Sequence, residues 1–239
     1  MPGFGLRRLV SRIRRRLYSE FWARWISVLP VAPLSPMGGF ERGRPIDRVY
    51  IEGFLARHAD DIRGHALEVG DDTYCRRFGQ DKVTRQDILS DSAVNPATTI
   101  VGDISRPETL PNSVFDCIVL TQVLQYVFDL PSAVRSIHSA LKPGGVALIT
   151  VPAVSHLVAD EWRSQWCWLF TQTSVTRLFE DVFGNADLEV NSYGNCLTAT
   201  AFHYGLAVKD ISVRALEQHD PSYPICLTVA VRKGLDDGG

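Results

Sequence analysis

Five short apolar segments between residues 65 and 152 are separated by stretches of helical length, and this alternation most constrains the fold. The segments are HALEVG (65–70), KVTRQDIL (82–89), ATTIVGD (97–103), VFDCIVLTQ (114–122) and VALITVP (146–152). The fourth is apolar enough to be buried on both faces, as strands in the middle of a parallel sheet are. The sequence therefore predicts an α/β fold with a doubly wound, mostly parallel sheet and helices on both sides.

Further elements flank these strands. We expect helices over residues 45–64, 130–141, 174–184 and 197–207, the first ending at a glycine and the second before Lys-Pro-Gly-Gly. Two late strands, 188–195 and 224–233, are expected to add an antiparallel edge to the sheet. With 239 residues, 45% of them hydrophobic, the chain can bury one large core.

The first 40 residues differ from the rest. Residues 1–25 carry seven arginines against one acid, Glu20, a net charge of +6, whereas the whole chain carries −2. Apolar residues recur there every three or four positions, which predicts an amphipathic helix, and the Pro/Gly-rich segment 30–39 indicates a linker. We therefore expect a basic arm over 1–40 and one domain over 41–239.

The arm has several possible partners. It could pack on its own domain, pack on a second subunit of a homo-oligomer, or lie on an anionic membrane surface; nucleic acid is not expected. Glu20 and Arg24 interrupt the apolar stretch that a signal peptide needs, and no stretch reaches the roughly 18 apolar residues of a membrane span. The sequence thus favours a cytoplasmic protein, which could also contact a membrane peripherally.

The five cysteines are odd in number and form no C-x-x-C pair. This argues against a disulfide framework and against a structural zinc site. We expect reduced cysteines buried as small apolar residues, and no metal.

Acidic residues follow the predicted strands. Ligands of an open parallel sheet bind outside the carboxyl ends of its strands, where Gly70-Asp71, Asp87 and Gly102-Asp103 are expected. Asp87 lies 17 residues after Gly70, close to the roughly 20 residue offset of an acid that binds ribose hydroxyls. So acidic a crevice suits a nucleoside with a cationic part and no phosphates better than NAD or ATP.

Residues 102–152 closely resemble the second half of the class I S-adenosylmethionine-dependent methyltransferase core. The resemblance rests on an acid after the third strand, Leu-Pro, Phe-Asp opening the fourth strand, and Leu-Lys-Pro-Gly-Gly before the fifth. It runs from about residue 64 to 152. It implies a Rossmann-like sheet of seven strands with an antiparallel edge strand, and S-adenosylmethionine as cofactor.

The resemblance also implies roles for individual residues. Glu68 and Gly70, with Asp71 or Asp72, are expected at the methionyl end of the cofactor. Asp87 with Ile88 is expected at the ribose, and Asp103 with Ile104 at the adenine. Thr121 and Gln122 are expected to form the floor beneath the sulfonium. Apart from the resemblance, Asp87 and Asp103 could equally cap helices or pair with surface bases.

The opening motif departs from the family pattern. Asp72 and Tyr74 stand where members typically have the second and third glycines after Gly70. Asp tolerates positive φ better than most residues, and S-adenosylmethionine has no pyrophosphate that must approach the loop closely. We therefore expect a variant cofactor loop, although a catalytically inactive binding or scaffold module stays open. VGDDTYCRRFG also resembles a bacterial subgroup associated with sugar and secondary-metabolite pathways.

For the acceptor the sequence offers aromatic and titratable side chains. His156 follows the fifth strand and is the first candidate for general base, and the weaker candidates are Tyr126, Asp129 and His203. The cluster EWRSQWCWLF, where the family often inserts an acceptor-binding loop, could stack on a sugar or cover the core; its tryptophans are Trp162, Trp166 and Trp168.

These observations lead to a functional hypothesis. We expect a methyltransferase acting on a small-molecule or glycan acceptor, with a hydroxyl of a sugar, glycolipid or secondary-metabolite intermediate as the methylated group. Tyr126 is expected to contact this acceptor together with the three tryptophans.

Overall fold

The computed structural model describes residues 3–155, 161–184 and 187–235. The chain divides into two compact units, Met1–Leu34 and Ser35–Gly239. The smaller unit is mainly one helix, α1 (Gly3–Ile26). The larger unit begins before residue 41, because the Ser35 N–H donates to the Tyr204 carbonyl and the Ser35 hydroxyl accepts from the Gly39 N–H. Residues 35–40, expected in the linker, therefore belong to the larger unit.

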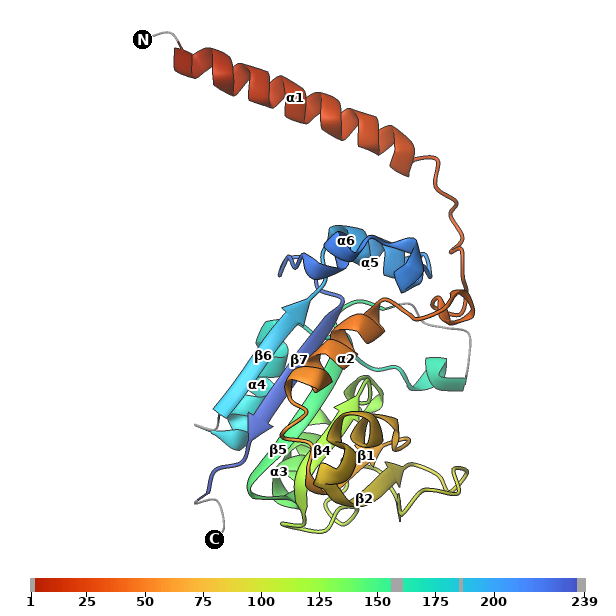
Figure 1. Cartoon of the computed structure of the whole chain (residues 1–239), viewed down its shortest axis with the longest axis vertical. Helices are drawn as coiled ribbons and strands as arrows, with labels where there is room; N and C mark the ends of the chain where they lie inside the picture. Colours follow the sequence, from red (N-terminus) through yellow and green to blue (C-terminus); the bar gives the residue numbers. More distant parts are fainter. Residues whose placement is uncertain (1–2, 156–160, 185–186, 236–239) are drawn as a thin grey trace. The chain divides into compact units, whose positions relative to one another are not determined.

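The larger unit is built on a sheet of seven strands in the order β3-β2-β1-β4-β5-β7-β6 (Figure 1). Strands β1 to β5 pair in parallel, whereas β7 pairs antiparallel with both β5 and β6. The mostly parallel sheet with antiparallel pairing at one edge is thus confirmed. The strands are β1 (Gly64–Val69), β2 (Val83–Ser90), β3 (Ile100–Val101), β4 (Phe115–Thr121), β5 (Leu141–Pro152), β6 (Asp187–Tyr193) and β7 (Cys226–Arg232).

Helices cover both faces of this sheet, because successive strand residues point to opposite sides. Ile118 and Leu120 of β4 join the core beneath α3 and α4, whereas Cys117 and Val119 join the core beneath α2 and α5. In Figure 1, α2 crosses the face of the sheet turned toward the viewer. The helices of this unit are α2 (Asp47–Arg57), α3 (Leu130–Ala140), α4 (Gln172–Phe183), α5 (Cys196–His203) and α6 (Val213–Glu217).

Several boundaries differ from the expectations. The third strand keeps two residues of the predicted seven, and α6 was not anticipated. Strand β5 begins at Leu141, so that the Lys-Pro-Gly-Gly segment lies inside it, with Gly144 at φ +78°. Three cysteines are buried as expected, but Cys167 and Cys196 are exposed.

Within the described part of the chain, none of the helices combines the length and the apolar character needed to cross a bilayer.

Candidate active site

The loop after β1 is held by a buried carboxylate. Glu68 is 2% exposed, and its two carboxylate oxygens accept the backbone N–H groups of Tyr74, at 3.0 Å, and Cys75, at 2.8 Å. Burial raises the pKa of Glu68 to about 7, against the opposing effect of these two donors. Glu68 thereby closes the loop onto the end of β1, where Gly70 has φ +94°.

The two missing glycines are not required by the backbone of this loop. Among the described residues other than glycine, positive φ occurs at Gln80, Ser113 and Gln122, and so not at Asp72 or Tyr74. The remaining acids serve the loop itself. Asp71 accepts the N–H of Thr73 at 2.9 Å, and Asp72 pairs with Arg76 at 2.5 Å. Only Gly70 needs the conformational freedom of glycine here.

A cavity of about 790 Å³ lies at the carboxyl ends of β1, β2 and β4, and we call it the cofactor cavity. Its volume falls within the range of about 300–1,000 Å³ typical of cofactor sites. The structure brings five of the expected cofactor residues together along its wall, and these are Gly70, Asp103, Ile104, Thr121 and Gln122. Glu68, Asp71, Asp72 and Ile88 do not line it.

Carboxylates dominate the charge of the cofactor cavity. Among the described residues, Asp91, Asp103 and Asp129 line it, against one lining cation, Arg106. Asp103 also accepts from the N–H and hydroxyl of Ser105, both at 2.8 Å. Asp129, a weak candidate for general base, accepts the N–H of Ser132 and so caps α3. This excess of negative charge favours a cationic ligand.

Asp87 does not reach the cofactor cavity. Strand β2 continues to Ser90, and Asp87 pairs in register with Leu67, inside the sheet. Its carboxylate lies 2.6 Å from Nε2 of His65. Burial acts to raise the pKa of Asp87, but its hydrogen bonds, the one to His65 first, lower this pKa overall. Strand β2 lies within one residue of the predicted segment 82–89, so Asp87 lies inside it and the acid that follows the strand is Asp91. Extending the predicted strand KVTRQDIL by one residue, to Ser90, would have made Asp91 the acid at its end.

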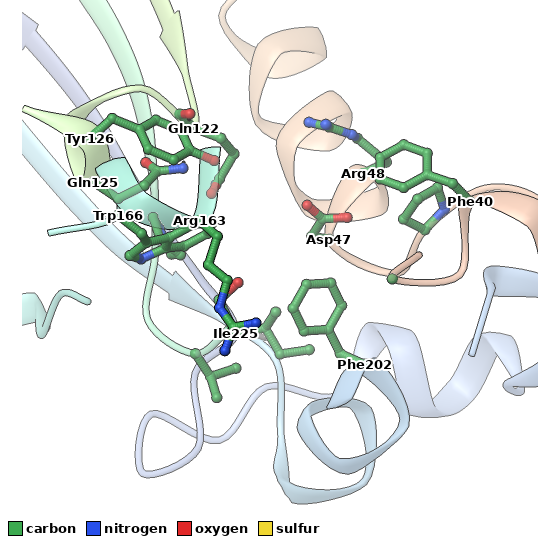
Figure 2. A pocket seen from close by; sticks show the side chains of 15 residues that line it. Phe40, Asp47, Arg48, Gln122, Gln125, Tyr126, Arg163, Trp166, Phe202 and Ile225 are labelled. Carbon is green, nitrogen blue, oxygen red and sulfur yellow. Dashed lines mark hydrogen bonds between the residues drawn. The ribbon is translucent and has the colours of Figure 1, made fainter. Parts of the chain in front are cut away.

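A second cavity, of about 180 Å³, adjoins the first, and Gln122 and Tyr126 line both. Figure 2 shows Phe40, Asp47 and Arg48 on one side of it and Gln122, Gln125, Tyr126 and Trp166 on the other. The first group comes from the start of the larger unit and the second from the segments after β4 and β5. We call this second cavity the acceptor cavity.

Gln122, at the junction of the two cavities, has a strained backbone. It directly follows β4 with φ +57°, a value that residues other than glycine seldom adopt. Its N–H donates to the Thr150 carbonyl at 2.9 Å, which fixes this turn against β5. Such conformations cluster at functional sites.

Gln125 places a buried amide beside Gln122. The side chain is 1% exposed, and its Nε2 donates to the Gln122 carbonyl at 2.9 Å. Its Oε1 is buried and has no hydrogen-bond partner among the described residues. A buried acceptor atom of this kind normally has a partner, so this oxygen is available to a ligand group or a water in the cavity. Sequence reasoning missed Gln125 and Asp47, because neither lies in a recognisable motif.

The predicted aromatic residues have different roles. Trp166 lines the acceptor cavity and packs edge to face on Tyr126, with 5.1 Å between ring centroids. Trp168 does not line it; the Trp168 Nε1 donates to the Val127 carbonyl and the ring packs on Phe128. Of the proposed stacking residues, Tyr126 and Trp166 therefore meet at the cavity.

Other expected residues lie elsewhere. His156 and the side chain of Trp162 are outside the described residues, and His203 is exposed on α5 without lining either cavity. No group of three metal-ligating side chains is found among the residues that the structure describes.

Comparison with known proteins agrees with the fold. A family model described as a methyltransferase domain matches residues 49–189. A SAM-dependent methyltransferase from Archaeoglobus fulgidus superposes with a TM-score of 0.53 at 10% identity, covering 78% of this chain and 94% of that one. One from Mesorhizobium loti gives 0.53 at 16% identity, covering 79% and 98%. No curated protein matches the sequence. At these identities the structural matches establish the fold.

Proposed function

The chain belongs to the methyltransferase domain family, and we propose that it methylates a hydroxyl group of a sugar-like acceptor bound in the acceptor cavity. The protein is a class I S-adenosylmethionine-dependent methyltransferase, and S-adenosylmethionine is its cofactor. The observation that carries the proposal is the pair of adjoining cavities, which meet at Gln122 and Tyr126.

The residues of the cofactor cavity fit this cofactor. S-adenosylmethionine carries a sulfonium and an ammonium group but no phosphate, and the cavity offers three carboxylates against one guanidinium. We assign the ribose hydroxyls to Asp91, which follows β2, in place of Asp87. Asp103 and Ile104 keep the adenine, and Thr121 and Gln122 the floor, as the resemblance implies.

The acceptor cavity combines aromatic faces with hydrogen-bonding groups. Tyr126, Trp166 and Phe202 offer apolar surface, whereas Asp47 and Gln125 offer oxygen acceptors. Sugars present C–H faces that pack on aromatic rings and hydroxyls that donate to such oxygens. An acceptor hydroxyl that donates to Oε1 of Gln125 would satisfy an otherwise unpaired buried atom. Analogues lacking that hydroxyl would be strongly rejected.

Transfer to a hydroxyl also requires a base. When bound, S-adenosylmethionine supplies the methyl group, which forms a bond to the acceptor oxygen as the bond to sulfur breaks, and the hydroxyl proton is released. Asp47 is the carboxylate that lines the acceptor cavity, so we propose that it accepts this proton. His156 remains the alternative base proposed from the sequence.

Two measurements test the function. Titration calorimetry with S-adenosylmethionine and S-adenosylhomocysteine should show one site per chain. Transfer of a labelled methyl group should then be assayed on a panel of sugars, with matched deoxy-sugars as controls. Absence of binding by the folded protein would favour the inactive binding module. Binding with transfer to amines but no sugar would overturn the acceptor class.

Variants then separate the roles of the residues. Gln125→Leu should raise KM for the acceptor while the cofactor Kd stays unchanged. Asp47→Asn should lower kcat about 10²- to 10⁴-fold and remove the acidic limb of its pH profile. The same losses in His156→Gln, with Asp47→Asn fully active, would transfer the role of base to His156.

A further inference from the structure

The C-terminal half of α1 exposes an aromatic cluster. Phe21 and Trp22 pack edge to face at 5.4 Å, Tyr18 and Trp22 at 6.0 Å, and Phe21 lies 6.2 Å from Trp25. These four rings are 47% to 67% exposed. The apolar side chains that continue this surface are also exposed, and they are Leu17, Ile26, Val28 and Leu29. So large an apolar surface marks an interaction site.

Positive charge surrounds this cluster. Arg14, Arg15 and Arg16 are exposed one turn before it, Arg24 lies within it, and Glu20 is the acid among them. Three further arginines precede them in the sequence, at positions 7, 8 and 12. The larger unit carries the compensating negative charge, so the arm is the part suited to an anionic partner.

We propose that α1 binds the surface of an anionic lipid bilayer, with the aromatic cluster at the headgroup boundary and the arginines on the lipid phosphates. Tryptophan and tyrosine favour this boundary because their rings are apolar and their N–H or O–H groups are polar. Arginine stems can lie along the apolar boundary while the guanidinium groups stay in water. A helix that is rich in arginine and aromatic residues but not apolar enough to span a bilayer suits this position.

The other occupants of this surface fit less well. A second copy of α1 would bring two sets of arginines together, which like-charge repulsion opposes. Nucleic acid would satisfy the arginines but leave much of the apolar surface at Leu17, Ile26 and Leu29 without a partner. A bilayer with anionic headgroups satisfies both parts of the helix.

The test uses the full chain and sedimentation with vesicles. Vesicles of phosphatidylcholine with about one third phosphatidylglycerol should bind the protein at least tenfold more strongly than pure phosphatidylcholine, because each arginine gains energy near an anionic surface. Added salt should weaken binding through screening. Equal binding to both vesicles, or none, would overturn the proposal.

Variants assign the binding to the helix. Arg14→Gln/Arg15→Gln/Arg16→Gln and Trp22→Ala/Trp25→Ala should each reduce binding at least tenfold. A charge-matched control in exposed arginines of the larger unit, Arg135→Gln/Arg177→Gln/Arg214→Gln, should bind as the wild type does. Circular dichroism establishes that every variant is folded. Loss of binding in the control alone would place the contact on the larger unit and contradict the proposal.

Two further readouts identify a different occupant. Light scattering should show no dimer through α1. A dimer that Trp22→Ala/Trp25→Ala dissociates, in a protein that does not bind vesicles, would assign the surface to a second copy. Binding of a fluorescent oligonucleotide in place of vesicles would assign it to nucleic acid. Either result overturns the bilayer proposal.

Discussion

At the scale of single residues, Asp87 and Asp91 are four positions apart in the sequence but have different surroundings. Asp87 is held by His65 within the sheet, whereas Asp91 is exposed at the wall of the cofactor cavity. Hydrogen bonds to a charged group contribute about 1.5–3 kcal/mol. We therefore expect Asp91→Ala to raise the Kd for S-adenosylmethionine about 10- to 100-fold, measured by titration calorimetry.

The matched control for this prediction is Asp81→Ala. Asp81 is an exposed acid that lies before β2 and lines neither the cofactor nor the acceptor cavity. This variant should keep the Kd for S-adenosylmethionine within about twofold of the wild-type value. A twofold change corresponds to less than about 0.5 kcal/mol, since a tenfold change is about 1.4 kcal/mol. A loss of affinity in Asp87→Asn, with Asp91→Ala unchanged, would restore the ribose role to Asp87.

Glu68 gives a prediction about pH. Its pKa is raised from 4.5 to about 7, so between these values the folded state binds a proton that the unfolded state has lost. The free energy of unfolding therefore falls as pH rises through this window, by up to about 3 kcal/mol in total. Urea unfolding at about pH 5 and about pH 8 should show this loss in the wild type but not in Glu68→Gln.

The test with Glu68→Gln compares pH dependence, not absolute stability, and it needs a control for the lost charge. Glutamine offers one acceptor oxygen to the two loop donors, so the variant is less stable at all pH values, and the difference between pH values carries the test. Exposed Glu217→Gln controls for a general loss of charge. A wild type and a Glu68→Gln variant with parallel pH profiles would contradict the raised pKa.

At the scale of elements, the strands were predictable but their ends were not. FDCIVLT forms β4 because an apolar run of this length must be buried on both faces. The end of β2 depends on its partner, since Val69 of β1 pairs with Leu89 and draws the strand past Asp87. Composition does not reveal this register, so the sequence did not show that Asp91, and not Asp87, lines the cofactor cavity.

The acceptor cavity was the least predictable part of the site. Its walls come from residues 38–48, 122–126, 152–155, 163–166, Phe202 and Ile225, which are far apart in the sequence. Their meeting depends on how α2 and α5 pack on the sheet. Asp47 begins α2 in a segment expected only to form a helix, so its place at this cavity had no signal in the sequence.

Because the backbone is strained at the end of β4, we expect glycine to be more stable than alanine there, the reverse of the usual order. Alanine and glycine at position 122 both remove the Gln122 side chain, but glycine alone adopts φ +57° freely. Gln122→Gly should therefore be more stable than Gln122→Ala by about 1 kcal/mol, measured by denaturant unfolding. At Thr84, an exposed residue of β2, the order should be the usual one, with alanine the more stable. The same order at both positions would contradict the strain.

At the scale of the whole molecule, the residues of the proposed catalytic site and those of the proposed membrane contact belong to different units. Among the described residues, those that line the cofactor and acceptor cavities lie between Gly38 and Ile225, within the larger unit. The exposed aromatic cluster of α1 lies in the smaller unit. Cofactor binding should therefore be independent of the substitutions that remove membrane binding.

Thermal unfolding tests this independence in the full chain. S-adenosylmethionine at about 100 times its Kd stabilises the folded state by about 2.7 kcal/mol, which corresponds to a rise in Tm of about 5–10 °C for a domain of this size. The rise should be equal in the wild type and in Trp22→Ala/Trp25→Ala, because neither tryptophan lines the cofactor cavity. Asp91→Ala, with its higher Kd, should show a smaller rise at the same cofactor concentration. A smaller rise in the tryptophan variant would mean that the arm contributes to the cofactor site, and that attachment and catalysis are coupled.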